Sequence, residues 1–425
     1  MEFTDNAMAT ILIYSHLGLR DQELQPYSLR EWNILVDELL NTEYKDPSAL
    51  LGQNVDHVIN ELNYTEPQKI RLKLLLSRGG SVALSLDELS RKGIYVVVRS
   101  DKNYPTLMRK RLLKKTPPIL FYSGDLSLAN KIGIAVVGSR NIDKECEEFT
   151  RILVEKATSE KLIVFSGGAR GIDSISESTA LSCGGAVVSF VADSLTSKIK
   201  KREVISYIQK NQMLLISEVN PDVGFTVARA MNRNKYVYTS SCGAFVIASD
   251  YNKGGTWTGA TENIKNNWVK TLVWDQNRFK GNVELINHGA TAFGDLENET
   301  ILELMKKKNE YYQEDIFSMQ ANQSLISEEN NYNKELVENK KDVLESKKKV
   351  LENKKENENI ILTKDLYKVV LPTILNVLSE PLTIENACGI LNIGKNQLHI
   401  WIKRGIDTGV IEKLNQPIRY IAKLK

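Results

Sequence analysis

Several features that often reveal a protein's class are scarce in this sequence. The chain has four cysteines, Cys146, Cys183, Cys242 and Cys388, with no CxxC pair and no histidine at ligand spacing. This excludes a recognisable zinc module and provides no disulfide framework, as expected in a reducing compartment. No apolar run approaches the roughly 20 residues of a membrane span, and the N-terminus has acids where a secretory signal needs bases. We therefore expect a cytoplasmic protein with no metal, no cofactor and no membrane attachment.

An excess of charge of one sign is also missing. The 56 lysines and arginines nearly balance the 53 acidic residues, which leaves a formal net charge of +3. A polyanionic partner therefore cannot be inferred from global charge and needs local basic patches. At 425 residues the chain is too long for one ordinary core, so several domains are expected.

Four regions separate by pattern. Residues 1–90 show apolar residues at helical spacing and predict a small helical domain. Residues 91–300 alternate apolar runs with amphipathic stretches. Residues 301–360 are rich in Lys, Glu and Asn and include a seven-residue repeat, which predicts a charged helical or disordered spacer or, as the alternative, a dimerising stalk. Residues 361–425 regain periodicity as three helices and two short strands, the pattern of a winged helix.

The second region carries the strongest structural signal. Continuous apolar runs such as IGIAVVGS (132–139), KLIVFSGG (161–168) and MLLISEV (213–219) end in glycine, serine or an acid, and helical stretches follow them. Strands that are apolar throughout are typical of a parallel sheet covered on both faces. The predicted fold class is therefore α/β, with a Rossmann-like, doubly wound parallel sheet.

Phosphate-binding chemistry recurs where these runs end. Glycine lets a phosphate approach the backbone, and arginine and lysine supply the countercharge. Each loop taken alone also fits a tight turn or a solvated helix face. The candidate phosphate-binding or nucleic-acid-binding residues are Gly138, Ser139, Arg140, Ser166, Gly167, Gly168, Arg170, Gly171, Lys198, Lys200, Lys201, Arg202, Arg233, Asn234, Lys235, Lys253, Gly254, Gly255 and Thr256.

The predicted sheet gives these loops a common place. The carboxyl ends of parallel strands lie along one edge, and ligands bind in the crevice outside that edge. Loops far apart in the sequence should therefore form one basic crevice. Trp257, beside the last loop, either stacks on a base or belongs to the core.

The same motifs carry a family resemblance. VVGSR (136–140), SGGARGID (166–173), RNK (233–235), GGTWTGA (254–260) and GNVELINHGA (281–290) resemble, in order, the motifs of the DNA-processing protein A (DprA/Smf) family. The resemblance implies single-stranded DNA binding without hydrolysis, possible delivery of the strand to a RecA-type recombinase, and a homodimer formed through the Rossmann-like domain.

Departures from the family pattern indicate a divergent member. Family members commonly have histidine after RGID, where this chain has Ser176–Glu177, and the second arginine of their RNR motif is Lys235 here. A role in a mobile element or in phage defence is therefore an alternative to DNA uptake and recombination.

Two other functions use the same crevice. GGTWTGATE places Glu262 at a spacing comparable to that of the acid in LOG-type nucleotide phosphoribohydrolases, so N-glycosidic cleavage is the enzymatic alternative. The other alternative is a sensor of a nucleotide signal. The pattern of the C-terminal region fits binding either to duplex DNA or to a protein. If it binds DNA, the candidate contacts are Lys395, Asn396, Gln397, Lys403 and Arg404.

Overall fold

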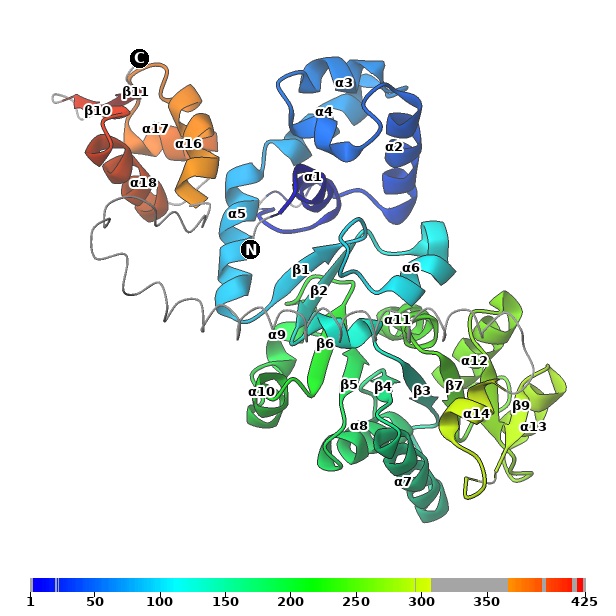
Figure 1. Cartoon of the computed structure of the whole chain (residues 1–425). Helices are drawn as coiled ribbons and strands as arrows, with labels where there is room; N and C mark the ends of the chain where they lie inside the picture. Colours follow the sequence, from blue (N-terminus) through cyan, green and yellow to red (C-terminus); the bar gives the residue numbers. More distant parts are fainter. Residues whose placement is uncertain are drawn as a thin grey trace, which may run out of the picture. The chain divides into compact units, whose positions relative to one another are not determined.

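The computed structural model describes residues 3–19, 21, 23–294, 296–306, 366–391, 395–414 and 419–422 (Figure 1). The predicted spacer lies outside the described residues from residue 307 onward, and so do the side chains of Lys395, Asn396 and Gln397. The chain divides into two compact units, Met1–Lys92 with Asn359–Lys425, and Gly93–Glu358.

The N-terminal region is helical, as its periodicity predicts. A buried cluster that includes Trp32, Leu35, Leu39 and Leu72 forms its core, where apolar positions at helical spacing meet. Its elements are α1 (Asp5–Tyr14), α2 (Leu29–Asn41), η1 (Pro47–Leu51), α3 (Val55–Glu61), α4 (Glu66–Leu76) and α5 (Gly79–Arg91).

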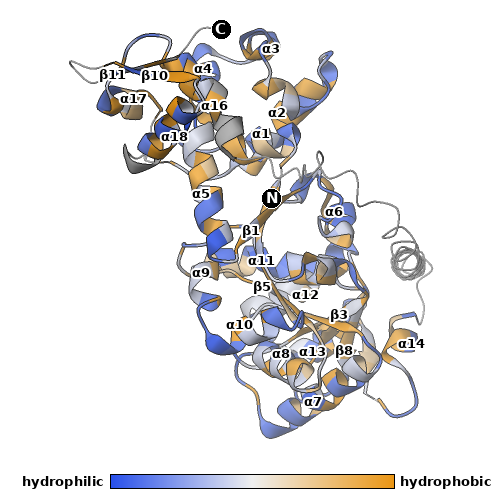
Figure 2. Ribbon diagram, turned by 60° about the vertical axis from the view of Figure 1, so that its left-hand side comes forward, coloured by the Kyte–Doolittle hydropathy of each residue, from blue (hydrophilic) through white to orange (hydrophobic). Residues whose placement is uncertain are grey.

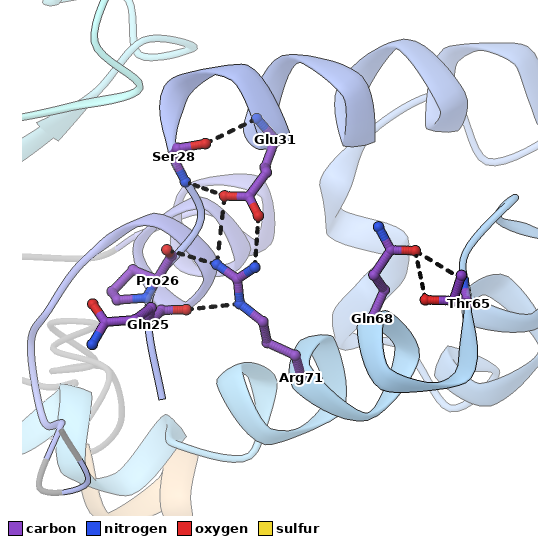
Figure 3. Close-up of polar contacts among 7 residues, drawn as sticks. All are labelled: Gln25, Pro26, Ser28, Glu31, Thr65, Gln68 and Arg71. Carbon is purple, nitrogen blue, oxygen red and sulfur yellow. Dashed lines mark hydrogen bonds and ion pairs between the residues drawn. The ribbon is translucent and has the colours of Figure 1, made fainter. Parts of the chain in front are cut away.

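A polar network fixes the start of α2 (Figure 3). Ser28 and Glu31 form a capping box, in which the Glu31 carboxylate accepts from the Ser28 amide at 2.7 Å. Arg71 on α4 donates to Glu31 at 2.6 Å and to the carbonyls of Gln25 and Pro26 at 2.9 Å each. These hydrogen bonds hold the pKa of Glu31 at about 2 against the effect of partial burial. The network therefore joins α4 to the loop that enters α2.

The C-terminal region has three helices and a two-stranded antiparallel sheet. Leu398, Trp401 and Ile402 are buried in its core together with Ile374 and Leu378. The elements are α16 (Leu366–Val377), α17 (Ile384–Leu391), α18 (Lys395–Asp407), β10 (Ile411–Leu414) and β11 (Arg419–Ala422). Their order is the one expected from the sequence; the winged-helix assignment itself stays a prediction.

The remaining unit contains one nine-stranded, mostly parallel sheet, in the order β1-β2-β6-β5-β4-β3-β7-β8-β9. The seven strands from β3 to β9 are parallel, and β1 and β2 extend the sheet in antiparallel pairing. The strands are β1 (Tyr95–Val98), β2 (Ile119–Ser123), β3 (Gly133–Val137), β4 (Ile163–Ser166), β5 (Val187–Phe190), β6 (Met213–Ser217), β7 (Gly243–Val246), β8 (Thr271–Trp274) and β9 (Thr291–Phe293).

Helices cover both faces of this sheet, which explains why its strands are apolar throughout. Alternate residues such as Ala135, Phe165 and Val188 join a cluster with Tyr236 of α11 and Trp257 of α12. The other residues face α7 and α8, which pack against β3 and β4. The outer surface of α7 is largely hydrophilic (Figure 2).

The helices of this unit are α6 (Thr106–Leu112), η2 (Leu113–Lys115), η3 (Leu126–Asn130), α7 (Lys144–Ser159), α8 (Ile172–Ser182), α9 (Leu195–Lys198), α10 (Arg202–Gln209), α11 (Val227–Ser240), α12 (Gly254–Asn266), α13 (Lys280–Asn287) and α14 (Ile301–Lys306). In α14, Ile301, Leu304 and Met305 are buried, and Lys270 of the sheet domain donates to the Leu304 carbonyl at 2.7 Å. Packing of the sheet domain therefore continues to residue 306, past the expected boundary at residue 300.

The strand order has one reversal. From β3 the chain proceeds through β4, β5 and β6 toward one edge, and it then returns to β7 beside β3 and continues to the other edge. The adjacent strands β3 and β7 therefore lead into connections that run in opposite directions. In open α/β sheets this is where a ligand crevice forms. In the part of the chain that the structure describes, no helix is long and apolar enough to cross a membrane.

Candidate functional site

A pocket of about 520 Å³ lies at this reversal. Three separate loops contribute to it: the loop after β3, the loop after β4 and the loop between β7 and α12. One side of α11 completes the wall. Of the residues predicted from the sequence, Gly138, Ser139, Arg140, Gly167, Arg233, Asn234, Lys253, Gly254, Gly255 and Thr256 line the pocket.

The first two loops interlock through glycines. A Cβ at Gly138 would lie 2.4 Å from a side-chain atom of Ile172, and one at Gly171 would lie 2.4 Å from the Ser139 carbonyl oxygen. Gly171 also has φ +82°, which L side chains rarely adopt. The amide of Ile172 donates to that carbonyl at 3.3 Å, and the amide of Ser139 donates to Ala248 O at 2.8 Å. These glycines thus allow close packing between the loops after β3, β4 and β7.

Arg233 lies at the floor of the pocket and is only 7% exposed. Its guanidinium fills the place of a side chain at Gly167, where a Cβ would be 1.2 Å from Nη1. Asp173, also buried, accepts from the Ala169 amide at 3.3 Å. Burial raises the pKa of Asp173, while the charge of Arg233 acts to lower it. The floor therefore holds a buried cation and a buried carboxyl group whose charges influence each other.

The rim differs from the floor in exposure. Arg140 and Lys253 are exposed, and Gly254 begins the 13-residue helix α12 with φ +80°. The Asn234 side-chain amide donates to the Gly255 carbonyl at 3.2 Å and so joins α11 to the first turn of α12. Two side-chain cations and the start of α12 therefore lie at the same opening. Because the free amides of a helix N-terminus also attract anions, this opening favours a negatively charged ligand.

The other predicted residues do not line this pocket. Arg170 is exposed on the loop after β4. Lys200 and Lys201 are exposed between α9 and α10, and Arg202 is exposed at the start of α10. Lys198 pairs with Asp193 at 3.6 Å. Lys235 donates to Asn232 at 2.6 Å. The predicted residues outside the pocket lining also include Ser166, Gly168, Gly171 and Glu262, the acid of the enzymatic alternative.

Sequence reasoning missed part of the wall. Phe225 and Val227 line the pocket and are 54% and 70% exposed, and Met231 lies further along α11. Phe225 could have been found from the sequence, because it is an aromatic residue within the loop-like segment 220–226. Trp257, in contrast, is buried against Tyr251 and His288, so the core interpretation is the one confirmed.

Comparisons with known proteins agree with this architecture. Residues 95–306 match the family model of the DNA recombination-mediator protein A. Protein Smf of Escherichia coli (strain K12) is 26% identical over 182 residues, 42% of this chain and 48% of the relative, so the match spans about half of that protein. The DNA processing protein DprA of Bacillus subtilis (strain 168) is 25% identical over 229 residues, 52% of this chain and 75% of the relative.

A solved structure supports the fold. The X-ray structure of DprA from Streptococcus pneumoniae superposes with a TM-score of 0.54 at 18% identity, covering 73% of this chain and 99% of that chain. The shared sheet, the matched domain and the curated relatives lead to the same assignment: the chain belongs to the DNA-processing protein A (DprA/Smf) family.

Proposed function

We propose that the chain binds single-stranded DNA in the pocket between β3 and β7 and does not cleave it. The observation that carries the proposal is the meeting of three distant loops at one opening, with Arg140 and Lys253 exposed on its rim. The DprA relatives are named as DNA processing proteins, which is consistent with this substrate class.

The rim has the chemistry that a sugar–phosphate backbone requires. A guanidinium binds a phosphate through two parallel hydrogen bonds, and an ammonium adds a point charge. The backbone amides at the start of α12 supply further donors without sequence preference. The strand would therefore be held mainly by its phosphates, and affinity would fall as salt rises.

The test is a fluorescence-polarisation titration of single- and double-stranded oligonucleotides at several salt concentrations. We expect tighter binding of the single strand and a log–log salt slope of about −0.7 per neutralised phosphate. Arg140→Ala should weaken binding of all sequences about fivefold and flatten the slope by about 0.7. Lys265→Ala, which removes an exposed cation near the other end of α12, is the matched control. Unchanged affinity in Arg140→Ala would remove this residue from the site.

Family membership supports finer proposals about partners. We propose that the protein forms a homodimer through the sheet domain and delivers the bound strand to a RecA-type recombinase, in DNA uptake, recombination or phage defence in the cytoplasm. Light scattering of the purified chain tests the dimer. Co-precipitation with a recombinase in the presence and absence of single-stranded DNA tests the delivery step.

A further inference from the structure

A run of basic residues in α6 and η2 lies outside the pocket. Residues 102–124 include no aspartate or glutamate, and none of them lines the pocket. Because the whole chain carries a formal net charge of only +3, this segment is a strong local excess of positive charge. Such an excess is the condition for contact with a polyanion. The cations of the segment are Lys102 and, at the end of α6 and in η2, Arg109, Lys110, Arg111, Lys114 and Lys115.

Two arginines fix the position of this run. Arg109 donates to the Arg99 carbonyl at 2.9 Å, and Arg111 donates to the Thr239 carbonyl at 3.1 Å. Thr239 lies in the last turn of α11, so the end of α6 is held against the end of that helix. Both acceptors are neutral carbonyl groups, and these bonds therefore place the run without adding a carboxylate to it.

Lysines and one leucine form the exposed side of the run. Lys110, Lys114 and Lys115 are exposed, and Leu113 is 71% exposed. Leu113 also has φ +50°, a left-handed conformation that is uncommon for residues other than glycine. The chain turns at this residue without burying its side chain, although leucine is most often buried. These four residues, named here the α6–η2 patch, offer cations to phosphates and an apolar group to a sugar or a base.

The helix α11 borders both this patch and the pocket. It packs against α6 (Figure 1), and its residue Asn234 lines the pocket. The next residue is Lys235, whose pKa is lowered by burial, while the charges of Glu218 and Glu262 act to raise it. The charge of Lys115 lowers this pKa further, so Lys115 lies within electrostatic reach of Lys235. A strand that leaves the pocket over α11 can therefore reach the α6–η2 patch.

We propose that the α6–η2 patch holds a second stretch of the same single strand by its phosphates, after the strand has passed over α11 from the pocket. This inference rests on the proposed single-strand binding and adds a surface that shares no residue with the pocket. Lysine ammonium groups are point charges on long stems, so they neutralise phosphates without a fixed geometry and without sequence preference. The patch should therefore act only on strands that are long enough to extend beyond the pocket.

The experiment is a polarisation titration of the full-length protein with two labelled single strands, of about 5 and about 20 nucleotides. Lys114→Ala/Lys115→Ala should weaken binding of the long strand about fivefold or more and flatten its log–log salt slope by about 1.4, because two phosphates lose their countercharge. Binding of the short strand should change less than about twofold. Lys210→Ala/Lys265→Ala, which removes two exposed lysines elsewhere in the sheet domain, is the matched control and should change neither affinity.

Two outcomes of this titration would overturn the inference. Unchanged affinity of Lys114→Ala/Lys115→Ala for the long strand, or an equal loss for both strands, would mean that the patch adds no contact beyond the pocket. Lys114→Arg/Lys115→Arg keeps both charges and should retain the affinity for the long strand within about twofold. A loss as large as that of the alanine variant would contradict a role of charge. Failure of the unaltered protein to bind either strand would instead remove the proposed function.

Exposed lysines around an apolar side chain also fit the surface of an anionic membrane. Cosedimentation with vesicles of phosphatidylcholine and phosphatidylserine tests this other partner. We expect equally weak sedimentation of the unaltered protein and of Lys114→Ala/Lys115→Ala. Vesicle binding that is lost in the variant, together with unchanged affinity for the long strand, would overturn the inference in favour of a lipid surface.

Discussion

At the scale of single residues, the pocket depends on glycines that leave room for other groups. The absence of a side chain at Gly167 allows the Arg233 guanidinium to lie against the loop after β4. This arrangement brings a cation from α11 to a carboxyl group from α8. Arg233 is therefore a buried residue that shapes the floor of the pocket.

The first prediction concerns Gly167→Ala. The new methyl group would overlap Arg233 Nη1, so either the loop or the guanidinium has to move. Overpacking of this kind typically costs about 1–3 kcal/mol of stability. Urea denaturation of the sheet domain measures it. Gly294→Ala, at a glycine of the same domain with open space around it, is the control and should leave stability unchanged or slightly raised.

The second prediction concerns Glu31 and pH. Its pKa of about 2 lies below the ordinary 4.5, so its contribution is complete above pH 4.5 and is lost as pH falls from 4.5 toward 2. Because the Glu31 side chain is 40% exposed, we expect Glu31→Gln to cost only about 1 kcal/mol at neutral pH. Thermal unfolding of wild type and variant should differ at pH 6 and converge near pH 2. A constant difference over this range would rule out the charge as the cause. Glu66→Gln, at a carboxylate that is 77% exposed in its ion pair with Lys69, is the control.

At the scale of elements, variants in α18 can distinguish binding of duplex DNA from binding of single-stranded DNA. Trp401 and Ile402 pack inward, while His399, Ile400, Lys403 and Arg404 are exposed on the same helix. Contact of this exposed face with duplex DNA stays a prediction from the sequence, because burial of one helix face is common to most surface helices.

The third prediction follows from this amphipathic helix. The double variant Lys403→Ala/Arg404→Ala should weaken binding of duplex DNA about threefold to tenfold, because two phosphate or groove contacts are lost. Binding of a single strand should change less than twofold and serves as the internal control. Gel-shift titrations with both substrates measure the effect. Unchanged duplex affinity would favour protein binding by this region.

At the scale of the whole molecule, the sheet unit contains every residue that lines the pocket, from Val137 to Thr258. Its helices cover both faces of its own sheet, and α14 packs beneath β7 through Met305. Nothing in the lining comes from the N-terminal or C-terminal regions that the structure describes.

The fourth prediction is therefore that residues 93–306 fold alone and retain affinity for single strands within about threefold of the full chain. Circular dichroism checks the fold by its cooperative melting, and polarisation checks binding under the same salt conditions. An affinity loss beyond tenfold in a folded fragment would place part of the single-strand site outside the sheet unit.

The sequence by itself determined the local structure: strands such as 132–137 are apolar throughout because both faces are covered, and glycines follow them where chains pack closely. It also indicated the family through its ordered motifs. The tertiary structure alone decided which loops meet, because strand order places β3 beside β7 although more than 100 residues separate them. It likewise placed Arg233 inside, Arg170 outside and Phe225 at the mouth of the pocket. No periodicity sets the directions of Arg170 and Phe225, since a loop side chain points where its neighbours leave space. Arg233 lies on α11 and fits inside because Gly167 has no side chain.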